Sequence, residues 1–202
     1  MRKLNHSQPG AKNDTSQERP QPGYMKVGLV RHCEISASTK RFCLNSEEFT
    51  AWVKNYESSK LKIGQYIKPF SGWHKCISSS STRTFQTAEL LYGSHFDKTD
   101  LIVEIPIAPV FKTSLRLPLI FWLVAGRLAW LVSHKSQPES MQDTVQRVKL
   151  FISNLLSSGD TEVLVVSHGF IMSLIRKELL SNGFKGEKFF KAKHGRLYIY
   201  ER

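Results

Sequence analysis

Short apolar runs alternate with amphipathic segments along most of the chain. The first run, 25–32, has an almost continuous apolar centre, which is typical of a strand in a sheet that is covered on both faces. Runs of the same kind occupy 74–80, 101–107 and 161–168, and the closing residues 195–202 have the pattern of an edge strand. The pattern therefore predicts a sheet built from segments that lie far apart in the chain.

The segments between these runs carry apolar residues at helical spacing. Asn45 and Glu48 have the spacing of a capping box at a helix start, and Gly93 marks a helix end. We expect helices over 46–57, 82–93, 142–158 and 169–183. Strands that alternate with helices predict an α/β fold: a three-layer α/β/α sandwich with a mostly parallel central sheet, helices on both faces and right-handed crossovers.

The segment 115–132 departs from this alternation because it is apolar almost throughout. A membrane-spanning helix needs about 20 mostly apolar residues, and this shorter run is interrupted by two arginines and a proline. We therefore expect an apolar helical insert that is buried or forms a lid. Three aromatic side chains are expected to give it an apolar face, which leaves a weak membrane-surface or dimer contact open: Phe121, Trp122 and Trp130.

Length and composition are those of an ordinary globular protein with one core. The chain has 202 residues, of which 41% are hydrophobic and 23% are charged. Residues 1–23 are polar and contain several prolines, so they cannot bury enough surface to fold alone. We expect a disordered leader over 1–23 and one catalytic domain over 24–202.

The net charge of +12 narrows the class of partner. The basic residues are scattered and form no known nucleic-acid module, so we expect no nucleic-acid partner. The charge instead permits a small phosphorylated substrate. The histidines and cysteines show no metal-ligand spacing, and we predict neither a metal nor another cofactor.

Three cysteines, an odd number, do not suggest a disulfide framework. The first residues also lack the apolar core of a secretory signal. Both observations favour a cytoplasmic protein.

Candidate chemistry appears where two predicted strands end. VGLVRH (27–32) and VLVVSH (163–168) both finish on a histidine. Ligands of open α/β sheets bind beyond the carboxyl ends of the strands. If these strands are parallel neighbours, His32 and His168 meet above the same edge of the sheet.

A third segment, SSSSTRTFQTAELL (78–91), also follows a strand and places Arg83 in the first turn of a helix. Alone, its serines equally suit a flexible loop with a helix cap. A helix N-terminus attracts anions, however, and the guanidinium groups of Arg31 and Arg83 can both grip a tetrahedral phosphate. Two imidazoles and two guanidiniums at one sheet edge therefore indicate phosphate chemistry.

These three motifs, in this order, resemble those of the histidine phosphatase superfamily, which includes the cofactor-dependent phosphoglycerate mutases. VRHCE stands where that family has Arg-His-Gly, and SSSSTRTFQTAELL is similar to its second-arginine motif. VLVVSHGF is similar to the strand and turn that carry its second histidine. The resemblance covers about residues 25–202.

The resemblance implies a role for each matching residue. His32 would be the nucleophile that forms a phosphohistidine, with its other ring N–H held by a backbone carbonyl. Arg31, Arg83 and His168 would bind the transferring phosphoryl group. The family also uses a carboxylate as proton donor, and Glu104, which follows Arg83 by 21 residues, fits that position.

The chain departs from the family pattern at several positions. Cys33 replaces the glycine after the first histidine, Ile35 stands where many relatives have threonine, and Ser80 with Ser81 replace Pro-Leu. Cys33 raises the question of whether the pocket keeps its backbone geometry, because glycine permits close approach to a phosphate. No loop of the cysteine-phosphatase type surrounds Cys33, which argues against a thiol nucleophile. Glu34 is a weaker rival of Glu104 as proton donor.

The resemblance implies a metal-independent phosphatase that hydrolyses a phosphomonoester. Mutases of this family tend to be longer and carry extra segments that grip the substrate carboxylate. Two alternatives remain: a mutase-type phosphotransferase, and a non-catalytic member that binds a phosphorylated or anionic partner.

Overall fold

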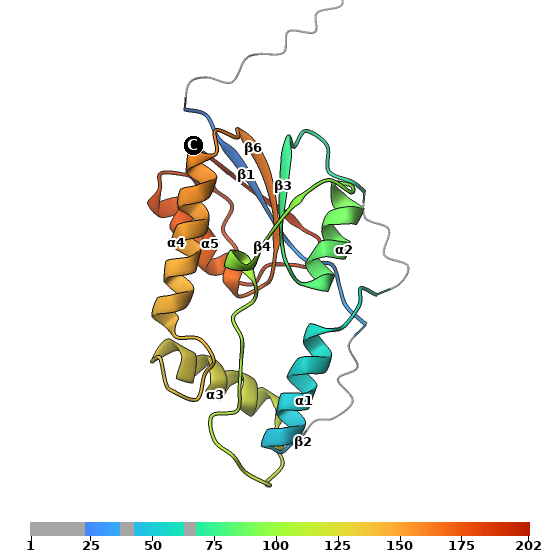
Figure 1. Cartoon of the computed structure of the whole chain (residues 1–202), viewed down its shortest axis with the longest axis vertical. Coiled ribbons are helices and arrows are strands. Elements are labelled where there is room, and N and C mark those ends of the chain that lie inside the picture. The colour runs from blue at the N-terminus through green and yellow to red at the C-terminus, as the bar shows by residue number, and fades with distance from the viewer. Residues whose placement is uncertain (1–22, 37–42, 63–67) are drawn as a thin grey trace, which may run out of the picture.

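A computed structural model describes residues 23–36, 43–62 and 68–202 of the chain. The expected leader, 1–23, lies outside the described residues except for Gly23. Figure 1 shows a central sheet with helices on both sides, and two further helices beyond one end of the sheet.

The central sheet has six strands in the order β4-β3-β6-β1-β8-β7. Strands β4, β3, β6 and β1 are parallel, while β8 and β7 are antiparallel, so the mostly parallel sheet is confirmed. The closing strand β8 is not at the edge as expected, because the two-residue β7 pairs with its outer side. The strands are β1 (Lys26–Arg31), β3 (Lys75–Ser79), β4 (Asp97–Thr99), β6 (Glu162–Ser167), β7 (Lys185–Gly186) and β8 (Leu197–Glu201).

Helices cover both faces of this sheet, as the three-layer prediction requires (Figure 1). They are α2 (Thr82–Leu91) on one face and α4 (Met141–Ser157) with α5 (Ile171–Ser181) on the other. Alternate residues of β6 serve the two layers: Val163 and Val165 pack with α4 and α5, whereas Leu164 and Val166 pack with α2. Burial on both faces explains the continuous apolar run of this strand.

A second, smaller assembly lies beyond the carboxyl ends of the parallel strands (Figure 1). It contains α1 (Ser46–Glu57), α3 (Leu119–Leu131) and a two-stranded sheet of β2 (Cys43–Leu44) and β5 (Leu117–Pro118). Its core is the cluster of Leu44, Phe49 and Trp122. The capping box predicted for α1 is confirmed, since Asn45 and Glu48 exchange side-chain-to-backbone hydrogen bonds.

The predicted strand over 101–107 is wrong. The chain forms a 3-10 helix, η1 (Asp100–Ile102), which the Thr99 hydroxyl caps by accepting from the Leu101 N–H. After η1 the backbone is irregular, and the apolar side chains of Ile102 and Ile105 are buried against the α4 and α5 layer. Burial alone, without strand pairing, therefore produced the strand-like pattern.

The apolar segment 115–132 does contain a helix, α3, but its orientation differs from the expected one. Trp122 and Trp130 are fully buried, and only Phe121 of the three aromatic residues is exposed. The indole N–H of Trp122 donates to the Leu44 carbonyl, which holds the ring inside. Across the described residues, no helix is both long enough and apolar enough to cross a membrane.

Candidate active site

His32 and His168 lie side by side at the carboxyl edge of the sheet. They directly follow β1 and β6, which are parallel neighbours with Arg31 paired to Ser167. The centroids of the two imidazole rings are 5.4 Å apart, with an interplanar angle of 62°. Both residues are almost fully buried, at 2% and 1% exposure. The fold thus brings the two predicted histidines together.

The hydrogen bonding of His32 leaves one ring nitrogen available. Its Nδ1 lies 2.7 Å from the Cys33 carbonyl oxygen, which can only accept, so Nδ1 carries the proton. Its Nε2 therefore keeps a lone pair. Burial lowers the pKa of His32 to about 3, and the charge of Arg83 acts in the same direction. The imidazole is neutral at physiological pH, which a nitrogen nucleophile requires.

His168 is held as the opposite tautomer. Arg83 Nε donates to His168 Nδ1 at 3.2 Å, so the His168 proton lies on Nε2. That nitrogen contacts the hydroxyls of Ser79 at 3.0 Å and Ser81 at 3.3 Å. Burial, followed by the charge of Arg83, places the pKa of His168 well below its ordinary value. His168 is therefore a neutral N–H donor.

Arg83 connects the sheet edge to the second assembly. It lies in the first turn of α2 and is buried. Its Nη1 donates to the carbonyls of Tyr56 at 3.3 Å and Glu57 at 3.1 Å, in the last turn of α1. Carbonyls at a helix C-terminus lack intrahelical partners and attract cations. The C-terminus of α1 therefore fixes this guanidinium over the histidines.

Arg31 offers a donor that nothing in the described residues satisfies. Its Nη1 donates to the Ala192 carbonyl at 3.0 Å, whereas its buried Nε has no hydrogen-bond partner there. Gly169, directly after His168, makes this position accessible, because a Cβ on it would lie 2.9 Å from Arg31 Cζ. A buried, unpaired N–H is costly, and an anion bound beside the histidines would satisfy it.

Glu104 lies beside the second-histidine turn, but in a loop after η1 instead of at a strand end. Its two carboxylate oxygens accept from the N–H groups of Phe170 and Ile171, each at 3.1 Å, where α5 begins. Oε1 also accepts from the N–H of Ile105 at 3.1 Å. The charge of Glu104 acts on Arg83, so the carboxylate belongs to the electrostatics of the same site.

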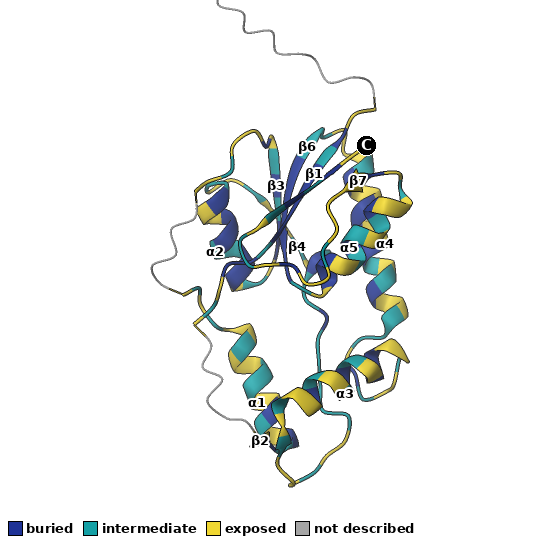
Figure 2. Ribbon diagram, turned by 180° about the vertical axis from the view of Figure 1, so that it is seen from behind, coloured by how far each residue is buried: buried dark blue, intermediate teal, exposed yellow. Residues whose placement is uncertain are grey.

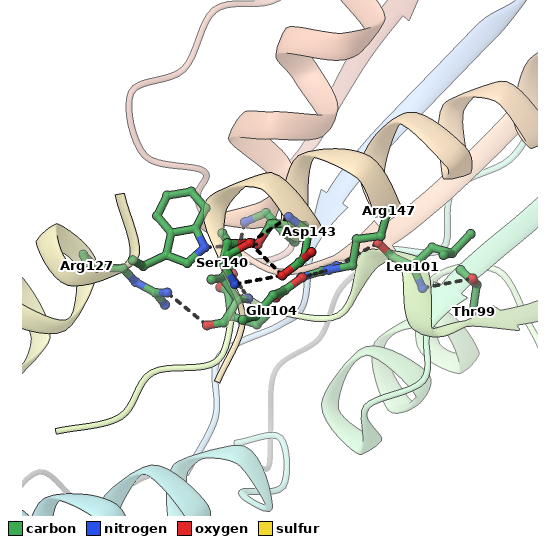
Figure 3. A network of polar contacts seen from close by, with 12 residues as sticks. Thr99, Leu101, Glu104, Arg127, Ser140, Asp143 and Arg147 are labelled. Atoms are coloured by element: carbon green, nitrogen blue, oxygen red, sulfur yellow. Dashed lines mark hydrogen bonds and ion pairs between the residues drawn. The ribbon is translucent and has the colours of Figure 1, made fainter. Parts of the chain in front are cut away.

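Two arginines clamp the loop that carries Glu104 (Figure 3). From α3, Arg127 Nη1 donates to the Ile105 carbonyl at 3.0 Å. From α4, Arg147 Nη1 donates to the Leu101 carbonyl at 2.8 Å. The loop therefore has backbone hydrogen bonds although it pairs with no strand.

Glu34, the rival proton donor, lies apart from this arrangement. Its side chain is 54% exposed and forms an ion pair with Lys62, with Nζ and Oε2 3.7 Å apart. No described contact joins its carboxylate to His32 or His168 by a hydrogen bond.

His194 is a third histidine of the site, which the sequence analysis did not select. Its Nδ1 donates to the His32 carbonyl at 2.8 Å, and its ring centroid is 5.0 Å from that of His32. Burial lowers the pKa of His194 below its ordinary value. His194 precedes β8, which the predicted sheet order placed at an edge, so no sequence signal brought it near His32. Ser79 and Ser81 were likewise treated only as loop and cap residues.

Cys33 fits the pocket without the conformational freedom of glycine. Its backbone is outside the left-handed region, and its N–H donates to the Thr87 hydroxyl at 3.0 Å. Its thiol is buried, and this burial raises the pKa of the thiol. A protonated thiol is a poor nucleophile. Among the described residues, no group of His, Cys, Asp and Glu is arranged to hold a metal ion.

Residues 122–201 match the sequence profile of the histidine phosphatase superfamily (branch 1). This range contains His168 and His194 but not His32, Arg83 or Glu104. No curated protein matches the chain in sequence.

Solved structures share the fold at low sequence identity. The protein of open reading frame Rv3214 from Mycobacterium tuberculosis has 15% identity and a TM-score of 0.54, over 87% of this chain and 90% of that one. A putative alpha-ribazole-5'-P phosphatase from Escherichia coli has 18% identity and a TM-score of 0.52, over 87% and 89%. Mycobacterial glucosyl-3-phosphoglycerate phosphatase Rv2419c has 15% identity and a TM-score of 0.51, over 78% and 80%. The resemblance indicated by the three motifs is confirmed.

Proposed function

From a chain that has the fold of the histidine phosphatase superfamily and matches its branch 1 over 122–201, we propose a phosphatase that hydrolyses a phosphomonoester through a phosphohistidine at His32. The observation that carries this proposal is the state of His32. A buried, neutral imidazole with its Nδ1–H bound to a carbonyl has a lone pair on Nε2 next to two guanidiniums. Cationic groups around a neutral nucleophile suit an anionic substrate.

In the first step, His32 Nε2 attacks phosphorus while the bond from phosphorus to the leaving oxygen breaks. Arg31 Nε and the charge of Arg83 stabilise the non-bridging oxygens, and the Nε2–H of His168 is placed to donate to them. The leaving oxygen takes a proton from Glu104, which must be protonated for this step.

In the second step, a water oxygen attacks the phosphorus of the phosphohistidine. The P–N bond breaks, its electron pair returns to His32 Nε2, and Glu104 accepts the proton of the water. This requires Glu104 to exchange a backbone hydrogen bond at the start of α5 for one to the substrate or water. The products are inorganic phosphate and an alcohol.

The direct experiment is phosphate release from p-nitrophenyl phosphate with the metal chelator EDTA present. We expect turnover by the wild type and none by His32→Ala. His95→Ala is the matched control, because His95 is exposed and far from the site in the sequence, and it should keep full activity. Full activity of His32→Ala would contradict the proposal.

The two alternative functions give different results in the same series. A mutase would interconvert phosphoglycerates and depend on a bisphosphorylated primer. A non-catalytic member would bind phosphate without turnover on a broad panel of phosphomonoesters. Either result would replace the phosphatase assignment.

The proposal places this enzyme in the reducing cytoplasm, with 24–202 as its catalytic domain and no nucleic-acid partner. All three cysteines are free, and Cys33 and Cys76 are buried, which suits a protein that does not rely on disulfides. Reaction without metal is part of the proposal and is tested by the EDTA condition above.

A further inference from the structure

Helix α3 carries an exposed face that is entirely apolar. At about 100° per residue, its members fall within an arc of about 120° around the helix. Figure 2 shows exposed residues along α3, at the end of the molecule opposite the C-terminus. Single exposed apolar side chains are ordinary, but a continuous set of this kind marks an interaction surface. This α3 face consists of Ile120, Phe121, Val124, Leu128, Leu131 and Val132.

The opposite side of α3 is fixed, so the α3 face cannot turn inward. The indole N–H of Trp122 donates to the Leu44 carbonyl at 2.8 Å, and that of Trp130 donates to the Thr144 hydroxyl at 3.0 Å. Gly126 packs so closely that a Cβ on it would lie 2.6 Å from Ile107. The helix is therefore held from within, and its outer face stays available to a partner.

The charges around the α3 face all have one sign. Arg127 is the sole charged residue of α3 and turns inward, with its guanidinium 4.7 Å from the ring of Phe170. No aspartate or glutamate occurs from residue 105 to residue 138. The exposed cations before and after the helix are Lys112, Arg116 and Lys135, of which Arg116 also pairs with Glu48.

We propose that the α3 face docks on a bilayer that contains anionic phospholipids. Apolar side chains would enter the boundary between headgroups and acyl chains, and the flanking lysines would meet lipid phosphates. A second copy of the chain is a poorer partner, because it would bring the same cations and another charge of +12 to the interface. Charge complementarity therefore selects the lipid surface.

Vesicle co-sedimentation tests this docking directly with the full chain. We expect binding to vesicles of phosphatidylcholine with about one third phosphatidylglycerol, and at least about tenfold weaker binding to phosphatidylcholine alone. Leu128→Glu should weaken binding to the mixed vesicles at least about tenfold. Leu150→Glu on α4 is the matched control, since Leu150 is 52% exposed against 58% for Leu128, and it should bind like the wild type.

The charge contribution needs a second pair of variants. Lys112→Glu with Lys135→Glu should weaken binding to the mixed vesicles several-fold, whereas Lys177→Glu on α5 should leave it unchanged. Equal binding to both vesicle types would contradict the proposal. So would a dimer, seen by light scattering without vesicles, that Leu128→Glu dissociates while no vesicle binding occurs.

Docking and catalysis fail separately. Leu128 is not part of the phosphate site, so Leu128→Glu should hydrolyse soluble p-nitrophenyl phosphate at the wild-type rate, which also shows that it is folded. Wild-type protein that binds vesicles without any turnover would support docking and remove the proposed phosphatase function.

Discussion

At the scale of single residues, the site depends on keeping two imidazoles neutral among cations. His32 and His168 have opposite tautomers because one faces a carbonyl acceptor and the other an Arg83 N–H donor. This difference gives each ring one defined task, an exposed lone pair on His32 and a donor N–H on His168. The sequence indicated both histidines but not their tautomers, which depend on neighbours brought together by folding.

His194 is a positioning residue in this account, since its Nδ1–H binds the carbonyl of the nucleophile. An asparagine amide can occupy the Nδ1 position, whereas a glutamine amide reaches the Nε2 position. We expect His194→Asn to keep kcat within a few-fold and His194→Gln to lower it about tenfold or more, because small displacements of a nucleophile are costly. The measurement is kcat and KM for p-nitrophenyl phosphate at matched thermal stability. Equal losses in the two variants would contradict positioning through Nδ1.

At the scale of elements, the predictions succeeded where local pattern decides structure. The capping box at Asn45 set the start of α1, and continuous apolar runs identified β1 and β6. They failed where tertiary contacts decide. Residues 101–107 look like a strand, but Arg127 and Arg147 bind the backbone carbonyls that a neighbouring strand would have used.

The same limit applies to α3 and to the third histidine. An almost uniformly apolar helix has no sequence signal for which side is buried, so Trp122 and Trp130 were expected on the wrong side. The pairing of β8 with β1 brings His194 next to His32 across the whole length of the domain. Neither contact follows from local spacing.

Glu104 has both a structural and a proposed chemical part, which leaving groups can separate. Glu104→Gln should reduce kcat for an alkyl phosphate about 10²-fold or more, and that for p-nitrophenyl phosphate much less, because nitrophenolate leaves without a proton. Glu104→Ala should also destabilise the fold by about 1 kcal/mol through loss of the acceptors at the start of α5. The measurements are kcat for both substrates and urea unfolding.

Glu34→Gln is the control for this series and should change neither quantity, since Glu34 lies at the surface with Lys62. Equal losses of Glu104→Gln on both substrates would mean that Glu104 acts only through the structure of the α5 turn.

At the scale of the whole molecule, the sheet supplies the histidines and the second assembly locks their surroundings. Arg83 bonds the sheet edge to the C-terminus of α1, and Arg127 bonds α3 to the Glu104 loop. The site therefore lies between two bodies of the fold, and the apolar α3 face lies on the outer body.

Burial of neutral histidines has a consequence for stability at low pH. The unfolded chain protonates His32 near pH 6.5, whereas the folded protein does so only near its pKa of about 3. The unfolded state therefore binds more protons between these values, and stability falls as pH falls through this window. At pH 5 this one residue should cost roughly 2 kcal/mol.

Urea unfolding at pH 7 and at pH 5 measures this cost. The wild type should lose roughly 2 kcal/mol more stability between the two pH values than His32→Asn, whatever the absolute stability of the variant. An equal loss in both proteins would show that His32 is not held neutral in the folded state.

The central claim is that His32 carries the phosphoryl group, and rapid quenching under alkaline conditions tests it most directly. Wild-type protein mixed with p-nitrophenyl phosphate should yield an acid-labile phosphoryl adduct on the peptide that contains His32, formed as fast as nitrophenolate is released. His32→Asn should yield no adduct. Turnover by the wild type without any adduct on that peptide, or an adduct that persists in His32→Asn, would contradict the account.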